Sequence, residues 1–600
     1  MVKVNGAQLV VRALDNQGIR VIFTLCGDNR LIYHYCNDPS CTETGIDIID
    51  FRHEQATGHA AMGYYLATGQ VGVCSVQSGP GITDLYPSIP IAYDASIPLV
   101  AICTSTALMD FEKLAQNEID VVPSFRSVTK WSGYCYETAR IPEYINMALR
   151  IATTGRRGPV LLLIPFDVLI KECDDELDIV HRAFKPVQKL RAFYGPYGNE
   201  ELVSKTVDLL LSANRPLIIA GTGTAFSDAS SELLKFAELT QIPVGVWGYG
   251  LGEFPANHPL FFGIASPLDG PGTALLQTVD VVLILGSRIT ELMNYGYMPC
   301  FSDEAKLIQV DIKAEEIGRN RAIDIPLVGD VKGVLSQMIK ITEKKLKSPK
   351  AETSWVKIVQ NQLQKFESRL EKEGSSDKIP IQPQRLVKEI RDYMPKDGII
   401  ILDGGDTTIW GLTYLRAHEP KSVYFSGGLG IQHLGGGVPM AIATKYAYPE
   451  KKVLVLTGDG SFLFNGKEIE TARKYNLPFV VVISNDRLWG MVARGQKMSH
   501  GKKFFGLGTS LSNETRYDKY AEAFSCYGEL ITDPNEIRPA LQRAFESHLP
   551  AVLDVRINPQ VNSIMNYLAK EGYNPDSWIR KVKKKEEIIL EVPAVKKKSE

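Results

Sequence analysis

The stretch that decides the fold is VLVLTGDGSFLFNGKEIETARKYNLPFVVVISNDRL, residues 453–488. Its two apolar, β-branched runs, 453–456 and 479–483, are typical of buried strands in a parallel sheet. A helix-forming segment lies between them, and this strand–helix–strand order predicts a parallel sheet with helices on both faces. We therefore expect an α/β fold.

The two loops that follow these strands carry residues suited to a metal and a diphosphate. The loop 457–461 (TGDGS) follows the first strand, and Asp486 follows the second strand, 27 residues after Asp459. Open α/β sheets bind ligands at the carboxyl ends of their strands. Gly458 and Gly460 allow a diphosphate to approach closely, and the two carboxylates are hard ligands that suit Mg²⁺. Because a GDG triplet alone is more often a tight turn, the prediction depends on the second loop.

Outward from this stretch, alternating strand and helix patterns divide the chain into three blocks of single-domain size. The blocks are residues 1–175, 195–340 and 380–560, and a charged tail follows at 561–600. We expect each block to be a doubly wound parallel-sheet domain. The charged segment 172–200 is expected to be a linker, and the Lys/Glu-rich segment 338–383 a surface helix with a second linker. Blocks one and three resemble each other in pattern only, and share no repeated motif.

The composition excludes several classes of protein. Hydrophobic residues are 44% and charged residues 23% of the chain, which excludes a disordered or fibrous protein. Lys and Arg number 67 against 69 Asp and Glu, so no basic field exists to gather nucleic acid or an anionic membrane. The nine cysteines are scattered without a zinc-ligand pattern, which favours a reducing compartment. With no secretory signal and no apolar run long enough to span a bilayer, we expect a cytoplasmic protein without nucleic acid or membrane partners.

A second group of motifs lies in the first block. The segment 51–55 (FRHEQ) follows an expected strand at 47–50 and opens a helix, so that Glu54 begins that helix. The segment 71–81 (VGVCSVQSGPG) is a strand that runs into a glycine turn. A carboxylate in the first turn of a helix is by itself ordinary, because it complements the helix dipole.

With these motifs the chain resembles the thiamin-diphosphate enzymes of the acetolactate synthase, pyruvate oxidase and benzoylformate decarboxylase superfamily, over nearly all of residues 1–560. The resemblance implies a pyrimidine-binding, a central and a diphosphate-binding domain, with thiamin diphosphate and Mg²⁺ as cofactors. It implies that Glu54 donates a proton to the pyrimidine ring nitrogen of the cofactor, and burial should raise the pKa of this carboxyl. The metal ligands would be Asp459, Asp486, which replaces the family's second Asn, and the backbone carbonyl of Leu488.

The resemblance also assigns the remaining contacts. The implied catalytic residues are Glu54, Gln77, Asp28 and His433, and the implied cofactor-binding residues are Gly405, Asp406, Thr407, Gln432, Leu434, Gly458, Gly460, Ser461, Met491, Arg288 and Asp311. Leu434 would wedge the cofactor into its bent conformation, and Asp406 would cap the following helix. His433 is either an acid/base group or an ordinary histidine, and Gln77 either faces substrate or bonds the backbone. Asp28 lies where some decarboxylases carry a catalytic Asp, but Thr104 and Ser105 replace the His pair that accompanies it.

The central block resembles the FAD-binding domain of acetolactate synthase. The matching motifs are 221–223 (GTG), 286–288 (GSR) and 310–312 (VDI), in which Arg288 and Asp311 would contact FAD. The segment 263–272 departs from the flavin-contacting sequence. FAD, another nucleotide and no nucleotide therefore remain three alternatives.

The implied reaction forms or cleaves a C–C bond next to a carbonyl group, as in 2-oxo acid decarboxylases, carboligases and lyases. Leu292 replaces an Arg of the family's GARFDDR that meets the acceptor carboxylate, and Gly495 replaces the Trp of GMVxQWQ that selects the second 2-oxo acid. These departures disfavour acetolactate synthesis from two 2-oxo acids, which remains the alternative, with Arg494 as the candidate replacement cation. A catalytically idle scaffold subunit is the alternative of another class. The resemblance implies a small carbonyl substrate and a homodimer or homotetramer with active sites at the subunit interface.

Overall fold

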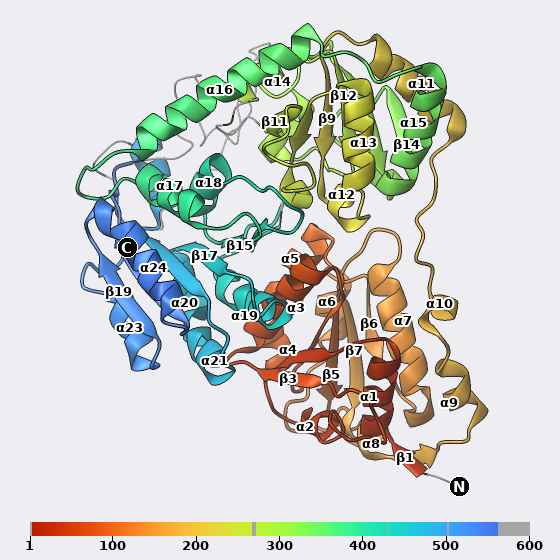
Figure 1. The fold of residues 1–600 in the computed structure, drawn as a ribbon. Coiled ribbons are helices and arrows are strands. Elements are labelled where there is room, and N and C mark those ends of the chain that lie inside the picture. The colour runs from red at the N-terminus through yellow and green to blue at the C-terminus, as the bar shows by residue number, and fades with distance from the viewer. Residues whose placement is uncertain are drawn as a thin grey trace, which may run out of the picture.

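The computed structural model describes residues 3–266, 270, 272–428, 430–500, 503 and 505–561. They form three parallel sheets of six strands each, with helices packed on the faces of the sheets (Figure 1). The expected fold class, three doubly wound α/β domains, is thereby confirmed. The expected tail at 561–600 lies outside the described residues apart from Val561, and part of the segment 263–272 does so as well.

The first sheet has the strand order β3-β2-β4-β5-β7-β6. Its strands are β2 (Val21–Thr24), β3 (Asp47–Asp50), β4 (Gly72–Ser75), β5 (Leu99–Ser105), β6 (Trp131–Tyr134) and β7 (Val160–Pro165), and its main helices are α1 (Gly6–Asn16), α3 (Glu54–Thr68), α5 (Ile89–Ala95) and α7 (Ile141–Thr153). Strands β2, β4, β5 and β7 are buried along their whole length, as their unbroken apolar sequences require.

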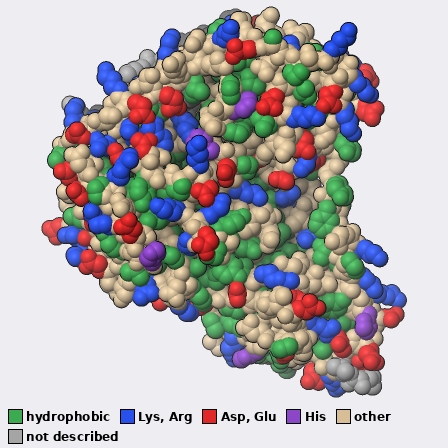
Figure 2. Space-filling model, in the orientation of Figure 1, with side chains coloured by type: hydrophobic (Ala, Val, Ile, Leu, Met, Phe, Trp, Pro, Cys, Tyr) green, Lys and Arg blue, Asp and Glu red, His purple; other side chains and the backbone are tan. Residues whose placement is uncertain are grey.

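The segment expected to be the first linker starts as part of this domain. Strand β8 (Glu172–Asp174) pairs antiparallel with β1 (Lys3–Asn5), and α9 (Asp178–Ala183) and α10 (Val187–Leu190) follow. Beyond α10 the chain runs along the first domain towards the central one (Figure 1). Figure 2 shows the outline of the molecule hollowed on this side, and shows acidic and basic side chains mixed over the visible face.

The central sheet has the order β11-β10-β9-β12-β13-β14. Its strands are β9 (Pro216–Ala220), β10 (Val244–Val246), β11 (Phe261–Ile264), β12 (Val281–Leu285), β13 (Lys306–Asp311) and β14 (Ile325–Val328), and its main helices are α11 (Glu200–Ser212), α12 (Thr222–Phe226), α13 (Ser230–Thr240) and α15 (Val331–Lys345). The segment expected to be a surface helix contains α16 (Ser354–Gly374), which buries an apolar stripe that includes Trp355 and Phe366. This helix spans from the central to the third domain (Figure 1).

The third sheet has the order β16-β15-β17-β18-β20-β19. Its strands are β15 (Ile399–Leu402), β16 (Val423–Phe425), β17 (Val453–Gly458), β18 (Val480–Asn485), β19 (Tyr527–Ile531) and β20 (Ala551–Arg556), and its main helices are α17 (Pro383–Tyr393), α18 (Asp406–Tyr414), α19 (Gly437–Ala447), α20 (Asp459–Asn465), α21 (Ile469–Lys474), α22 (Gly490–His500), α23 (Tyr517–Ala523) and α24 (Ile537–Glu546). When the strands are counted along the chain within each sheet, the first and third sheets share the order 2-1-3-4-6-5. The two domains therefore have one topology although no sequence motif is repeated.

The first and third domains pack together through α3 and α19. A Cβ atom on Gly63 would lie 2.6 Å from Cα of Met440, so the two helix backbones touch at a glycine. The short helix η7 (Gly466–Glu468) adds a polar contact, because both carboxylate oxygens of Glu468 accept the Arg52 amide at 3.1 and 3.0 Å. In the part of the chain described, no helix is both long and apolar enough to cross a membrane.

Candidate active site

The diphosphate-side loops lie at the point where the third sheet changes its direction of winding. Strands β15 and β17 are neighbours, and the chain leaves them towards opposite edges of the sheet, which opens a crevice at their carboxyl ends. A Cβ on Gly458 would lie 3.4 Å from Oγ1 of Thr407, and a Cβ on Gly404 would lie 3.7 Å from Cβ of Ser461. The N-termini of α18 and α20 thus converge on one small volume, an arrangement that binds phosphate through backbone amides.

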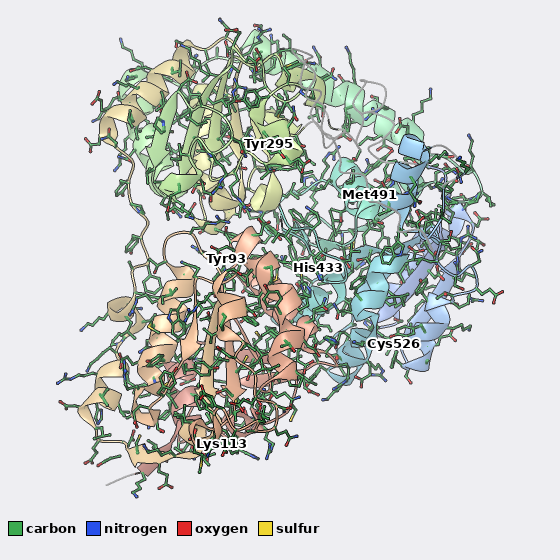
Figure 3. The ribbon with its side chains drawn as sticks, turned by 180° about the vertical axis from the view of Figure 1, so that it is seen from behind. Tyr93, Lys113, Tyr295, His433, Met491 and Cys526 are labelled. Carbon is green, nitrogen blue, oxygen red and sulfur yellow. The ribbon has the colours of Figure 1, made fainter. Side chains whose placement is uncertain are left out.

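Two large side chains border this crevice. The ring of Trp489 packs on the first turn of α20, where a Cβ on Gly460 would lie 2.6 Å from it. Met491, the second residue of α22, is 43% exposed, and its Cε would lie 3.4 Å from a Cβ on Gly405 (Figure 3). The structure therefore brings Met491 to the diphosphate-side loops, where the sequence analysis expects it.

Leu434 is anchored beside the same loops through its neighbour in the chain. The Gly435 amide donates to Oδ1 of Asp403 at 3.0 Å and to Oγ of Ser461 at 2.9 Å. Asp403 is buried and also accepts the hydroxyl of Ser426 at 2.7 Å. This network fixes the loop that carries Leu434, which is half-buried, against the start of α20.

The expected metal ligands Asp459 and Asp486 directly follow the adjacent strands β17 and β18, and both are buried. Asp459 accepts the Arg487 amide at 2.7 Å, and Asp486 accepts the Leu488 amide at 3.1 Å. Burial, together with the nearby charge of Asp486, raises the pKa of Asp459 to about 7. Burial also raises the pKa of Asp486, although Arg494 opposes it. Two buried carboxylates that resist ionising together are suited to a divalent cation, so the donor chemistry fits Mg²⁺.

The protein supplies only part of a coordination shell. No group of three or more His, Cys, Asp or Glu side chains that could hold a metal occurs among the described residues. The flanking groups of Leu488, the Arg487 carbonyl and the Trp489 amide, bond to residues 511 and 509, so the Leu488 carbonyl faces away from that segment. Oxygens of the cofactor and water would complete the octahedron that Mg²⁺ requires.

An ion-pair network that the sequence analysis missed lies beside this pair. Arg494 is 3% exposed, and its guanidinium bonds Asp486 at 2.8 Å and Asp406 at 2.9 Å. Asp406 is therefore not the helix cap: Gly405 holds that position, and Asp406 is the first residue of α18. Arg494 is likewise bound within the protein, and does not offer a cation to a substrate carboxylate. The sequence did carry a signal for this ion-pair network: Asp486 and Arg494 place opposite charges at two positions where the family motifs have the neutral residues Asn and Gln.

Glu54 lies at a second switch point, that of the first sheet. It is the first residue of α3 and is 7% exposed, and burial raises the pKa of its carboxyl, as expected. A Cβ on Gly81 would lie 3.3 Å from Oε1 of Glu54 and 2.8 Å from Cγ of Gln77, so the two side chains meet at this glycine. The charges that act on Glu54 within the described chain are Asp84 and Lys467.

Asp28 is held by three hydrogen bonds rather than left free. It accepts the amide of Ser78 at 3.2 Å and its hydroxyl at 2.6 Å, together with the hydroxyl of Thr104. Thr104 is one of the residues that replace the family's His pair. The carboxylate of Asp28 therefore joins the loops that follow β2 and β4 to the carboxyl end of β5.

His433 and Gln432 are engaged within the protein. The ring of His433 packs on His59 of α3, with centroids 4.9 Å apart, at the centre of the molecule where the first and third domains meet (Figure 3). Burial lowers the pKa of His433, so its imidazole is neutral at pH 7. Gln432 donates to the Gly428 carbonyl at 2.9 Å and braces its own loop.

The central domain has a cleft at its own switch point, between β9 and β12. The cleft has a volume of about 710 Å³ and its lining includes Gly223, Gly286, Arg288 and Asp311, so the structure brings both residues expected to contact FAD to one place. The volume fits a nucleotide. However, Arg288 is ion-paired with Asp94 at 2.9 Å, so its guanidinium is already partly engaged.

Comparisons with known proteins agree with this geometry. Residues 4–124, 203–338 and 403–555 match, in turn, the N-terminal TPP binding domain, the central domain and the C-terminal TPP binding domain of the thiamine pyrophosphate enzymes. A probable acetolactate synthase large subunit of Methanococcus aeolicus is 35% identical over 573 residues, which are 92% of each chain. The acetolactate synthase isozyme 3 large subunit of Escherichia coli is 32% identical over 91% of this chain and 93% of its own. The acetolactate synthase large subunit of Corynebacterium glutamicum is 31% identical over 92% and 86%.

Three consecutive domain matches define the class as thiamine pyrophosphate enzymes. Within that class the chain belongs to the acetolactate synthase type, because relatives above 30% identity extend over nearly its whole length. The expectation of a thiamin-diphosphate-dependent enzyme is thereby confirmed.

Proposed function

We propose that this chain is a Mg²⁺- and thiamin-diphosphate-dependent enzyme that forms or cleaves a C–C bond next to a carbonyl group. The observation that carries the proposal is the buried pair Asp459 and Asp486 beside the converging N-termini of α18 and α20. When bound, the cofactor supplies a stabilised carbanion for addition to a carbonyl carbon.

Each group of the chain has a defined task in this proposal. The amides near Gly405 and Gly458 bind the diphosphate, and Asp459, Asp486 and the Leu488 carbonyl hold Mg²⁺. Leu434 and Met491 shape the pocket around the cofactor. Glu54, whose pKa burial raises, holds the proton that it shares with the pyrimidine ring nitrogen. Gln77, which borders Glu54, faces the substrate.

Calorimetry and proton exchange test the proposal together. Wild-type protein should bind thiamin diphosphate with Mg²⁺, and Glu54→Gln should keep that binding while exchange of the cofactor C2 proton for deuterium slows by ~10²–10⁴-fold. Glu43→Gln, which removes an exposed carboxylate of the same domain, should exchange at the wild-type rate. No binding at millimolar cofactor would establish the idle scaffold instead, and unchanged exchange in Glu54→Gln would remove the role given to that residue.

Acetolactate synthesis is the second candidate, favoured by the names of the relatives. The local chemistry argues for a different acceptor, because Leu292 and Gly495 replace the Arg and Trp expected for a second 2-oxo acid, and Arg494 is bound by Asp406 and Asp486. A panel of 2-oxo acids, aldehydes, 2-hydroxyacyl thioesters and cyclic diketones, with detection of CO₂ and products, separates the two. Acetolactate formed from pyruvate alone would establish the second candidate.

We propose further that the central cleft holds a nucleotide such as FAD, which acid release and flavin absorbance would reveal. The proposed assembly is a homodimer or homotetramer in which Glu54 of one subunit serves the Asp459 side of another. Its support is the family resemblance, which implies active sites at the subunit interface. All nine cysteines are free, which supports the cytoplasm as the compartment.

A further inference from the structure

A cleft of about 390 Å³ lies on the first domain, at the amino ends of the strands of its sheet. Glu54 lies on the opposite side, at the carboxyl ends. Its walls are the loops that enter β2, β4 and β7 at their amino ends, together with residues 191–193 of the chain that leaves the domain after α10. Its volume is in the range of sites for small molecules. It adjoins the central cleft, and the two share Thr153, Arg157, Ala192 and Phe193 in their linings. Arg20, Arg191, Tyr64 and Tyr65 line only this cleft, and no role in the proposed chemistry is given to them.

The lining of this cleft is strongly basic. Arg20, Arg157 and Arg191 line it, and no Asp or Glu is among its described lining residues. Arg20 is ion-paired with Asp15 at 2.7 Å, but in the described part of the chain neither Arg157 nor Arg191 has a carboxylate partner. Because the whole chain carries a net charge of −2, this concentration of positive charge is local and does not reflect a basic protein.

Arg191 has donors that no described residue satisfies. Its Nε and Nη1 atoms are buried and have no hydrogen-bond partner in the described part of the chain, and burial lowers the pKa of its guanidinium. Leaving buried donors of a charged group unpaired is costly. A guanidinium offers a planar fork of N–H groups that matches a carboxylate or phosphate in two parallel hydrogen bonds.

Aromatic rings hold the two unpaired arginines at the cleft. Arg191 lies over the ring of Phe193 at 5.3 Å, and Arg157 lies over Tyr65 at 5.8 Å. The hydroxyl of Tyr65 also accepts a hydrogen bond from Arg157. These contacts orient the guanidinium groups without neutralising them.

We propose that this cleft is a binding site for a small phosphate-bearing molecule, held by Arg157 and Arg191. Phosphate satisfies both requirements of the lining, since it brings negative charge and several acceptors for the free N–H groups. The site also borders the helix that carries Glu54: Tyr64 and Tyr65 lie near the end of α3, and Glu54 begins it. A ligand in the cleft therefore contacts the same rigid helix as the candidate active site.

Calorimetric titration of the full-length protein, saturated with thiamin diphosphate and Mg²⁺, tests the proposal with inorganic phosphate, AMP and pyruvate as separate probes. Inorganic phosphate or AMP should bind, and Arg191→Gln and Arg157→Gln should each weaken that binding at least ~10-fold. Arg191→Lys, which keeps the charge and loses the fork, should bind with intermediate affinity. Arg182→Gln removes an exposed arginine of the neighbouring α9 and should bind as the wild type does.

The comparison among variants separates this site from the diphosphate-side loops, which contain neither Arg157 nor Arg191. Arg191→Gln also separates it from the central cleft, whose lining includes Arg157 but not Arg191. Equal phosphate affinity in the wild type, Arg157→Gln and Arg191→Gln would overturn the proposal. Binding of pyruvate with no binding of phosphate or AMP would also overturn it, in favour of a carboxylate site. Circular dichroism confirms that the variants are folded. The outcome is independent of the proposed function, which fails only if the cofactor itself does not bind.

Discussion

At the scale of single residues, the candidate metal site carries an unusual balance of charge. Two carboxylates, Asp406 and Asp486, bond one buried guanidinium, that of Arg494, and the buried carboxylate of Asp459 lies close enough to Asp486 for their charges to interact. The family motifs have Asn at position 486 and Gln at position 494, and these neutral side chains would need no counter-ion. Asp486 and Arg494 therefore act as a compensating pair, in which each residue is tolerated because the other is present.

This compensation predicts a coupled response to mutation. Arg494→Gln in cofactor-free protein should lower the free energy of unfolding by about 3 kcal/mol, because it leaves buried carboxylates without a counter-ion. In the double variant Asp486→Asn/Arg494→Gln the loss of unfolding free energy should be smaller, by ~1–3 kcal/mol, than the sum of the losses in the two single variants. Urea unfolding of wild type, Asp486→Asn, Arg494→Gln and the double variant measures this coupling.

The effect of Mg²⁺ on the stability of these variants provides a second test of the compensating pair. A divalent ion should restore more stability to Arg494→Gln than to wild type, because it supplies the missing positive charge. Arg416→Gln removes an ion pair with Glu367 elsewhere in the third domain, and its loss should not depend on Mg²⁺. Additive losses with equal Mg²⁺ effects would rule out the compensating pair.

At the scale of elements, the position of Glu54 depends on the third domain. Glu468 of η7 is fully buried and bonds the Arg52 amide, two residues before α3 starts. Burial raises the pKa of Glu468 from its ordinary 4.5 to about 7. The turn that presents Glu54 is therefore held by a carboxyl group whose charge changes near neutral pH.

This carboxyl predicts a pH dependence of stability. A raised folded-state pKa gives stability that is fully present below about 4.5 and is lost as the pH rises through about 7. Over that range wild type should lose ~1–3 kcal/mol relative to Glu468→Gln, which cannot ionise. Thermal unfolding of both proteins across the range measures the difference. The control is Glu470→Gln, at a more exposed partner of Arg52, whose stability should change with pH as that of wild type does. If the stability of Glu468→Gln also changed with pH as that of wild type does, the pH dependence would not come from Glu468.

At the scale of the whole molecule, the three domains place their candidate residues in the same way, near the point where each sheet changes its direction of winding. In each sheet the candidate residues lie around the point where the chain winds in opposite directions from two neighbouring strands: β2 and β4, β9 and β12, β15 and β17. Glu54 follows β3 and Asp486 follows β18, which are the strands next to two of these pairs. The pyrimidine-side, nucleotide and diphosphate-side candidates are thus generated by topology. The proposed function then requires Glu54 and Asp459 to meet across a subunit contact.

This requirement predicts complementation between inactive chains. Glu54→Gln and Asp459→Asn should each be inactive alone, but equal co-expression should restore about a quarter of wild-type activity. Half of the dimers would be mixed, and one of the two sites in each mixed dimer would contain both intact residues. Activity of separately purified and unmixed variants is the control. A completely inactive mixture, with mixed dimers demonstrated by differential tagging, would mean that each site is built within a single chain.

Much of the fold and of the candidate site was predictable from the sequence. Fully buried parallel strands such as β17 and β18 have apolar β-branched sequences that permit few other structures, so the predicted runs 453–456 and 479–483 agree with them to within two residues. The edge strands β6 and β19 were missed because they are only partly apolar, and β16 because it has only three residues. Asp459 and Asp486 were singled out because each follows a predicted strand, and Glu54 because its FRHEQ motif resembles that of the family; their roles stay predictions.

The sequence by itself thus determined the three α/β domains and the candidate residues that each sheet carries, since strand burial and loop composition are local properties. Tertiary structure decided the rest. The shared order of the first and third sheets, the pairing of Arg494 with Asp406 and Asp486, the packing of His433 on His59, and the arginine-lined cleft all join residues far apart in the chain. Such contacts depend on how sheets and loops meet in space, which no local pattern records.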